Sequence, residues 1–175
     1  ASLVGSEMCI RDRNKAHQDP LALQARDVLL SKFLLVSNGL ASADLNIVRG
    51  NERVLSARLA DAEFFLTVDR KSSSEQRRES LDRVTFAKGL GSLRDRSDRI
   101  TWLMHYLIKS LTISSDISPY ALTAAHFCKH DLVSQMVGEF PELQGLIGGK
   151  YLLEEGEDRQ AALAVAEHYQ PRGAG

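Results

Sequence analysis

The spacing of apolar residues predicts a mainly helical chain that follows one short strand. Residues 32–37 form an apolar run that ends at Asn38 and Gly39, a pattern typical of a strand entering a turn. The period then becomes helical, since Gly50 and Asn51 offer an N-cap before an apolar stripe. That stripe comprises Leu55, Leu59, Ala62 and Leu66. We therefore predict the first helix from residue 51.

Two capping signatures predict the next helices. Ser72 and Glu75 have the spacing of a capping box, in which each side chain accepts a hydrogen bond from the other residue's backbone amide. Ser92 and Asp95 repeat that spacing after Gly89 and Gly91 interrupt the pattern. The helix predicted after Ser92 has the longest apolar stripe, made of Ile100, Leu103, Met104, Leu107, Ile108 and Leu111.

The pattern of apolar residues after residue 117 predicts one long helix followed by two shorter elements. Ser118 and Pro119 supply a cap and a first-turn proline, and the apolar face that follows reaches Pro141. Residues 143–151 predict a shorter element, and Gly156 separates it from a final helix.

Three segments are expected along the chain. Residues 1–13 show no sustained period and resemble a translated sequencing adapter, so we set them aside as non-native. Residues 14–50 are expected to end a β-containing upstream domain. Residues 51–175 are expected to form a helical domain that is truncated at its C-terminus.

Composition fits one ordinary globular domain. The chain has 175 residues, of which 43% are hydrophobic and 26% charged. No apolar run approaches the ~20 residues of a membrane helix, so we expect a soluble protein with no membrane contact. The two cysteines, Cys9 and Cys128, give no disulfide framework, and a cytoplasmic location is expected.

Charge is distributed unevenly, although the net charge is −1. Residues 70–99 hold nine Lys/Arg against five Asp/Glu, a net +4, whereas residues 131–159 hold two bases against seven acids, a net −5. This uneven charge has two possible interpretations: the charged residues lie on solvated helical faces, or the basic segment forms a side of the molecule that faces RNA. The basic residues in the first segment are Arg70, Lys71, Arg77, Arg78, Arg83, Lys88, Arg94, Arg96 and Arg99.

His130 and Asp131 form the signature dipeptide of the HD superfamily of metal-dependent phosphohydrolases. Such a metal centre needs an earlier histidine and a later aspartate as further ligands. Arg96 stands where the earlier histidine is expected, and arginine cannot ligate a cation. We therefore expect no metal here, and keep a metal site at His130 and Asp131 as an alternative.

Two blocks, residues 50–65 and residues 136–145, resemble the beta subunit of the bacterial heterotetrameric glycyl-tRNA synthetase. Residues 86–95 and residues 167–172 extend the resemblance, which covers the chain from Lys15 onward. The resemblance implies an HD-like helical domain preceded by a short β-containing segment and lacking the metal ligands. His130 departs from the family pattern, which keeps the neighbouring lysine and aspartate without the histidine.

The resemblance also implies a function within a larger enzyme. The alpha subunit would activate glycine with ATP and Mg, while this beta-subunit fragment would help bind and position tRNA(Gly) without catalytic residues or a cofactor of its own. The nine basic residues of 70–99 are then the candidates for RNA contact. Arg58, Asp61 and Glu63 are candidates for contact with a neighbouring domain or with the alpha subunit.

Two other functions stay open from the sequence. One is an HD-type phosphohydrolase that uses His130 and Asp131 with a divalent ion. The other is a helical protein-interaction module with no role in RNA binding.

Overall fold

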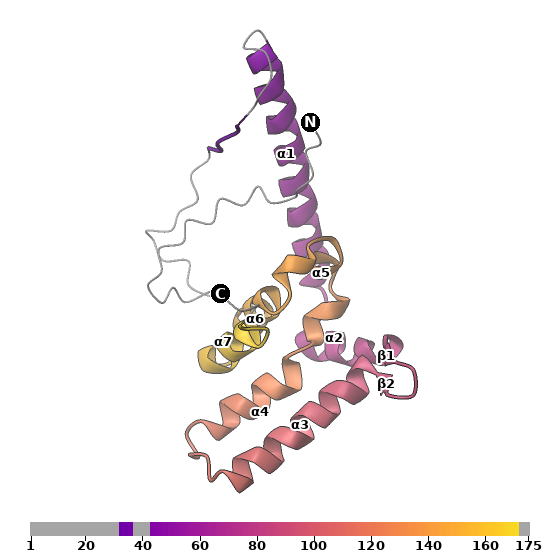
Figure 1. Cartoon of the computed structure of the whole chain (residues 1–175), viewed down its shortest axis with the longest axis vertical. Helices are drawn as coiled ribbons and strands as arrows, with labels where there is room; N and C mark the ends of the chain where they lie inside the picture. The colour runs from indigo at the N-terminus through magenta and orange to yellow at the C-terminus, as the bar shows by residue number, and fades with distance from the viewer. Residues whose placement is uncertain (1–31, 37–42, 172–175) are drawn as a thin grey trace.

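A computed structural model describes residues 32–36 and 43–171 (Figure 1). Within these residues the chain is mainly helical, which confirms the predicted fold class. A two-stranded antiparallel sheet, β1 Thr85–Ala87 and β2 Gly91–Ser92, lies between the second and third helices. The α-helices are α1 Asp44–Asp69, α2 Ser74–Ser80, α3 Leu93–Ser110, α4 Ser118–Phe127, α5 Gln135–Glu139, α6 Leu146–Glu154 and α7 Arg159–Glu167.

Helix α1 extends away from the other helices of the described residues, and within those residues it packs near its C-terminal end (Figure 1). Ala62 and Leu66 pack against a core cluster formed by Met136, Val137, Ile147 and Tyr151. Leu55 and Leu59 lie on the same stripe but are 37% and 63% exposed. The predicted stripe therefore exists, and only half of it is covered by the described residues.

The beginning of α1 differs from the prediction. The helix starts at Asp44, and Gly50 and Asn51 lie inside it. Asn51 does not cap the helix, because its side-chain amide donates to the Ile47 carbonyl oxygen at 2.8 Å. An interior glycine costs only about 1 kcal/mol relative to alanine, so Gly50 does not end the helical run.

The strand predicted over residues 32–37 is wrong for residues 32–36, which have an irregular backbone. Leu34 and Val36 are 72% and 89% exposed. A strand needs a hydrogen-bonded neighbour, and residues 32–36 pair with no strand in the part of the chain that the structure describes. Residues 1–31 and 37–42 lie outside the described residues.

Both capping boxes exist, and the first is shifted by one residue. Ser73 caps α2 together with Gln76, whereas Ser72 and Glu75 were predicted. Ser92 caps α3 as predicted: its Oγ accepts from the Asp95 amide at 3.1 Å, and Asp95 Oδ2 accepts from the Ser92 amide at 2.7 Å. The hydrogen bonds that the Ser92 amide and hydroxyl donate to the Asp95 carboxylate lower the pKa of Asp95.

Gly91 allows the sheet to join this cap closely. Its φ is +82°, and a Cβ at this position would lie 2.2 Å from Asp95 Oδ2. Any other residue would therefore combine backbone strain with a clash against the capping carboxylate. The hairpin and the start of α3 form one local unit.

The long helix predicted from Ser118 to Pro141 is interrupted. Helix α4 ends at Phe127, a 3₁₀ turn spans His130–Val133, and Ser134 caps the separate helix α5. Ser118 is not the cap of α4, since its hydroxyl donates to the Ser114 carbonyl at 2.8 Å. The apolar period continues across the break, which is why the pattern alone did not show it.

The C-terminal helices α6 and α7 agree with the two shorter elements predicted there. They pack against each other and α7 also packs against α4, with Leu152, Ala162 and Val165 fully buried. Of the helices within 43–171, none combines the length and the apolar character that crossing a bilayer requires.

Candidate functional site

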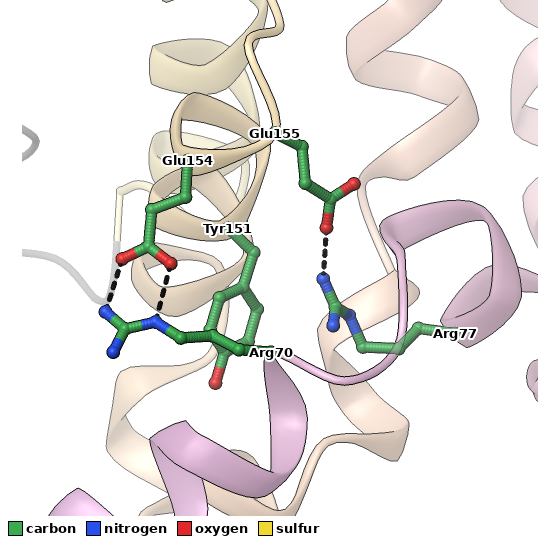
Figure 2. Close-up of a pocket in the computed structure, with 5 residues that line it drawn as sticks. All are labelled: Arg70, Arg77, Tyr151, Glu154 and Glu155. Carbon is green, nitrogen blue, oxygen red and sulfur yellow. Dashed lines mark hydrogen bonds and ion pairs between the residues drawn. The ribbon is translucent and has the colours of Figure 1, made fainter.

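Arg77 lies inside the molecule, where it ties α2 to α1 and α6. Its side chain is 5% exposed and stacks over the Tyr151 ring at 4.4 Å. The guanidinium donates to the Asp69 carbonyl oxygen at 2.8 Å, to the Ser72 carbonyl oxygen, and to Glu155 Oε1 at 2.8 Å. Figure 2 shows Arg77 facing Glu155 across the end of α6. All of these partners belong to the same chain, so Arg77 serves to hold its own fold together.

Asp69 is the second centre of this network. Its carboxylate accepts hydrogen bonds from the Gln135 amide at 2.8 Å, the Met136 amide at 3.0 Å and the Tyr151 hydroxyl at 2.8 Å. Burial, and then this hydrogen bond to Asp69, raise the pKa of Tyr151. Asp69 thereby joins the end of α1 to the first turn of α5 and to α6.

Arg78 is also buried, at 4% exposure. It pairs with Asp98 of α3 and donates to the His126 carbonyl oxygen of α4 at 3.0 Å. A guanidinium that is held inside the fold by two partners cannot reach a phosphate without breaking them. Burial of Arg77 and Arg78 therefore corrects the sequence-based candidate set, and we remove both residues from it.

The other seven basic candidates reach the surface. Arg70 pairs with Glu154 through two hydrogen bonds of 2.9 and 2.7 Å, as Figure 2 shows, and this pairing raises the pKa of Arg70. Arg96 lies over the Phe86 ring at 4.3 Å, and Arg99 donates to the Leu90 carbonyl oxygen at 3.0 Å. The remaining candidates, which form no ion pair with any described residue, are Lys71, Arg83, Lys88 and Arg94.

Four of the surface candidates surround the hairpin. Arg83 ends the 3₁₀ turn Leu81–Arg83, Lys88 lies between β1 and β2, and Arg94 and Arg99 lie on the first half of α3. These elements contact one another, and the Leu93 amide donates to the Val84 carbonyl oxygen at 2.8 Å. The structure thus gathers four cations at one end of α3, of which Arg83, Lys88 and Arg99 are exposed and Arg94 is half-buried.

The three interface candidates lie on α1, and one of them has an internal partner. Arg58 pairs with Glu139 of α5 at 2.8 Å and lies 5.5 Å from the centre of the Phe140 ring. Glu139 and Phe140 belong to the second of the two blocks that carry the family resemblance. Asp61 and Glu63 are exposed, and their carboxylates form no ion pair with any residue of the described ranges.

His130 is fully buried in the 3₁₀ turn after α4, and not in the middle of a helix as predicted. Neither ring nitrogen has a hydrogen-bond partner among the described residues, and the Phe127 ring packs edge-on at 5.7 Å. Burial lowers the pKa of His130 to about 3, and the positive charge of Arg77 acts in the same direction. This histidine is a neutral core residue.

Asp131 is fully buried beside His130. Its Oδ2 accepts from the Gly145 amide at 2.6 Å, and Gly148 packs against it so closely that a Cβ there would lie 3.0 Å from Oδ2. Burial raises the pKa of Asp131. No group of three or more His, Cys, Asp or Glu side chains suited to a metal exists within the described ranges, so they do not assemble the ligand set that the HD alternative requires.

Lys129, the neighbour of this pair, also has an internal role. Its ammonium lies 2.8 Å from His168 Nε2 and 3.8 Å from the centre of the Tyr169 ring. Because His168 Nδ1 lies 2.6 Å from the Val165 carbonyl oxygen, Nδ1 is the donor and Nε2 is left to accept from Lys129. Burial lowers the pKa of Lys129.

Two cavities lie near the end of α1. A cavity of about 190 Å³ is lined by the residues of Figure 2, which are Arg70, Arg77, Tyr151, Glu154 and Glu155. A groove of about 450 Å³ lies between α1, α5 and α6, with Leu66, Met136 and Phe140 in its apolar wall. The charged groups of the smaller cavity pair with each other, so it presents no uncompensated charge to a ligand.

Sequence reasoning missed Asp69, Tyr151 and the exposed ring pair of Trp102 and Tyr106. Asp69 carries no local signal, since its partners lie 66–82 residues further along the chain. Trp102 and Tyr106 do carry one, because they are spaced four residues apart on α3 and both fall outside its predicted apolar stripe.

Comparison with known proteins identifies the family. A family model described as glycyl-tRNA synthetase beta subunit matches residues 7–175. That match begins inside residues 1–13, the segment expected to be non-native, and those residues lie outside the described structure.

Three relatives named glycine–tRNA ligase beta subunit support the match. The relative from Acaryochloris marina is 44% identical over 174 residues, that from Bacillus subtilis 44% over 147, and that from Trichlorobacter lovleyi 46% over 147. These alignments cover 99%, 84% and 84% of this chain but only 24%, 22% and 21% of the relatives. The chain therefore spans about a quarter or less of their length, and it belongs to the glycyl-tRNA synthetase beta subunit family.

Proposed function

We propose that this chain is the part of a glycine–tRNA ligase beta subunit that helps bind and position tRNA(Gly) for glycylation by the alpha subunit. Family membership over residues 7–175 supports this assignment. The alignment covers 24% of the relative from Acaryochloris marina. In this proposal the ligase activity belongs to the complete heterotetramer of alpha and beta subunits. ATP and Mg act in that assembly, and this segment contributes no catalytic step.

The exposed positive charge near the hairpin is the observation that carries the RNA-binding part of the proposal. Arg83, Lys88 and Arg94 belong to adjoining elements, and each lacks an ion pair with the described residues. Cations that are not held in an ion pair can neutralise phosphates, and such contacts position RNA without reading its sequence. Arg96 and Arg99 on α3 extend this surface, and Lys71 and Arg70 are further exposed cations outside it.

In this proposal helix α1 makes the contact with the rest of the assembly. Its projecting half exposes Leu55 and Leu59 on the stripe that is buried further along the helix, and Asp61 and Glu63 are exposed beyond them. A neighbouring domain of the beta subunit or the alpha subunit would cover this stripe. Arg58 contributes indirectly, because its pairing with Glu139 fixes α1 to α5.

Charge reversal tests the RNA-binding role directly. We expect the double variant Arg83→Glu, Lys88→Glu to bind tRNA(Gly) more weakly and with a salt dependence reduced by about one per lost phosphate contact. The matched control is Arg49→Glu, Arg53→Glu on α1, which makes the same change in net charge at exposed positions. Equal affinity and equal salt dependence for both double variants would refute the assignment.

A further inference from the structure

Trp102 and Tyr106 form an exposed ring pair on α3. Their side chains are 69% and 59% exposed, and their rings are nearly parallel, with an interplanar angle of 13° and centroids 6.2 Å apart. Residues four apart are neighbours on one helical face, so the helix holds the two rings side by side. Neither ring belongs to the core clusters of the described residues.

Positive charge borders both ends of this ring pair. Arg99 lies about one turn before Trp102, and Lys109 lies about one turn after Tyr106; both are exposed. Arg99 donates one hydrogen bond to the Leu90 carbonyl oxygen and retains other donors. The rings are thus flanked along the helix by two cations.

The acidic residues on the same helix are already engaged. Asp95 accepts from Ser92 in the helix cap, and Asp98 pairs with the buried Arg78. His105 also lies on the exposed side, with its Nδ1 3.0 Å from the Thr101 carbonyl oxygen. Asp98 is thus charge-paired with Arg78, whereas Asp95 keeps its negative charge in the first turn of α3 and interacts with Arg99. Lys109, in the last turn of α3, forms no ion pair with any described residue.

We propose that Trp102 and Tyr106 form a stacking platform for unpaired bases of an RNA strand, with Arg99 and Lys109 directed at the adjacent phosphates. Aromatic rings combined with nearby cations are the means by which proteins hold single strands without sequence preference, since every base has a π face. That the ligand is RNA rests on the proposed function. The platform adds a site for unpaired nucleotides, whereas the hairpin cations can act on any phosphate backbone.

The fluorescence of the chain offers a direct test, because Trp102 is its single tryptophan. We expect octa-adenylate RNA, an unstructured single strand, to quench Trp102 emission when it binds the full 175-residue chain. Affinity for the labelled octamer, measured by fluorescence anisotropy, should fall about 5- to 150-fold in Trp102→Leu and in Tyr106→Leu. Trp102→Phe should retain most of the affinity, since it keeps a ring.

The leucine variants separate base stacking from protein docking. Leucine keeps an apolar surface for a partner helix but gives a base no ring to stack on. Phe64→Leu on α1 is the matched control, because Phe64 is an aromatic residue with a similar exposure of 62%.

Unchanged octamer affinity in both α3 leucine variants would overturn the platform. If tRNA(Gly) binding then still depended on Arg83 and Lys88, the proposed function would stand without it. Failure of the unaltered chain to bind either RNA would overturn both proposals.

Discussion

Burial separates arginines that look equivalent in the sequence. Arg77 and Arg78 are held inside the fold by partners on α1, α3, α4 and α6, whereas Arg83, only five residues further on, is exposed. The same positive charge therefore stabilises the fold at two positions and is available to a phosphate at the third.

Replacing Arg77 should destabilise the chain far more than replacing Arg83. Arg77→Ala removes the donor to the Asp69 carbonyl and to Ser74 Oγ and takes away the charge partner of Glu155, and we expect the free energy of unfolding to fall by about 2–4 kcal/mol. Arg83→Ala, at an exposed position, should change it by less than about 0.5 kcal/mol. Urea unfolding followed by circular dichroism measures both, and equal effects would contradict the structural role of Arg77.

His130 should make stability depend on pH. Its pKa is about 3 in the folded chain and about 6.5 when unfolded, so the unfolded state binds more protons between these values. The contribution is fully present above pH 6.5 and is lost as pH falls from 6.5 toward 3. Between pH 7.5 and pH 5 we expect His130 to account for a loss of about 2 kcal/mol.

The variant His130→Leu isolates this contribution, because leucine cannot be protonated. Unfolding free energies of both proteins should be compared at pH 7.5 and pH 5. The pH-dependent loss should be smaller in the variant by about 2 kcal/mol. Identical pH dependence in the two proteins would show that His130 is not a neutral buried residue.

At the scale of the element, the caps determine where helices begin. The run Ser72-Ser73-Ser74-Glu75-Gln76 offers two overlapping capping boxes with the same spacing, and the structure uses Ser73 with Gln76. Ser74 is the first helical residue in this register, and its hydroxyl and amide both donate to Glu155. The helix register that uses Ser73 as its cap is thus accompanied by the contact between Ser74 and Glu155, which lies 81 positions further along the chain.

Alanine substitution distinguishes the two registers. We expect Ser73→Ala to lower the free energy of unfolding by about 1 kcal/mol, the usual cost of losing an N-cap side chain. Ser72→Ala should have an effect below about 0.5 kcal/mol, since Ser72 makes its hydrogen bonds through its backbone: the amide donates to the Asp69 carbonyl and the carbonyl accepts from Arg77. Thermal or urea unfolding measures the difference, and a larger effect at Ser72 would favour the other register.

At the scale of the whole molecule, blocks that resemble the family are brought together in space. Arg58 in the first block contacts Glu139 and Phe140 in the second, and Lys129 contacts His168 and Tyr169. These residues hold the helices in place relative to each other. Other parts of the assembly can contact the exposed surfaces. These are the hairpin cations, the α3 rings and the projecting half of α1.

The features that could be predicted from the sequence are those that depend on side chains close together along the chain. The Ser92 cap, the mainly helical fold and the α1 stripe follow from side chains within a few turns of one another. Burial of Arg77 and the role of Asp69 depend on residues 66 or more positions away, which no local pattern encodes. The break between α4 and α5 was missed for a related reason, because the apolar period runs through it unchanged.

Charging of tRNA by an alpha subunit combined with a complete beta subunit that carries this segment tests directly whether Arg83 and Lys88 help bind tRNA(Gly). Glycine-dependent ATP–pyrophosphate exchange and the KM for tRNA(Gly) should be measured for the unaltered segment and for Arg83→Glu, Lys88→Glu. We predict that the KM for tRNA(Gly) rises about tenfold or more, while exchange without tRNA is unchanged. An unchanged KM in a folded, assembled enzyme would mean that Arg83 and Lys88 do not take part in binding tRNA(Gly).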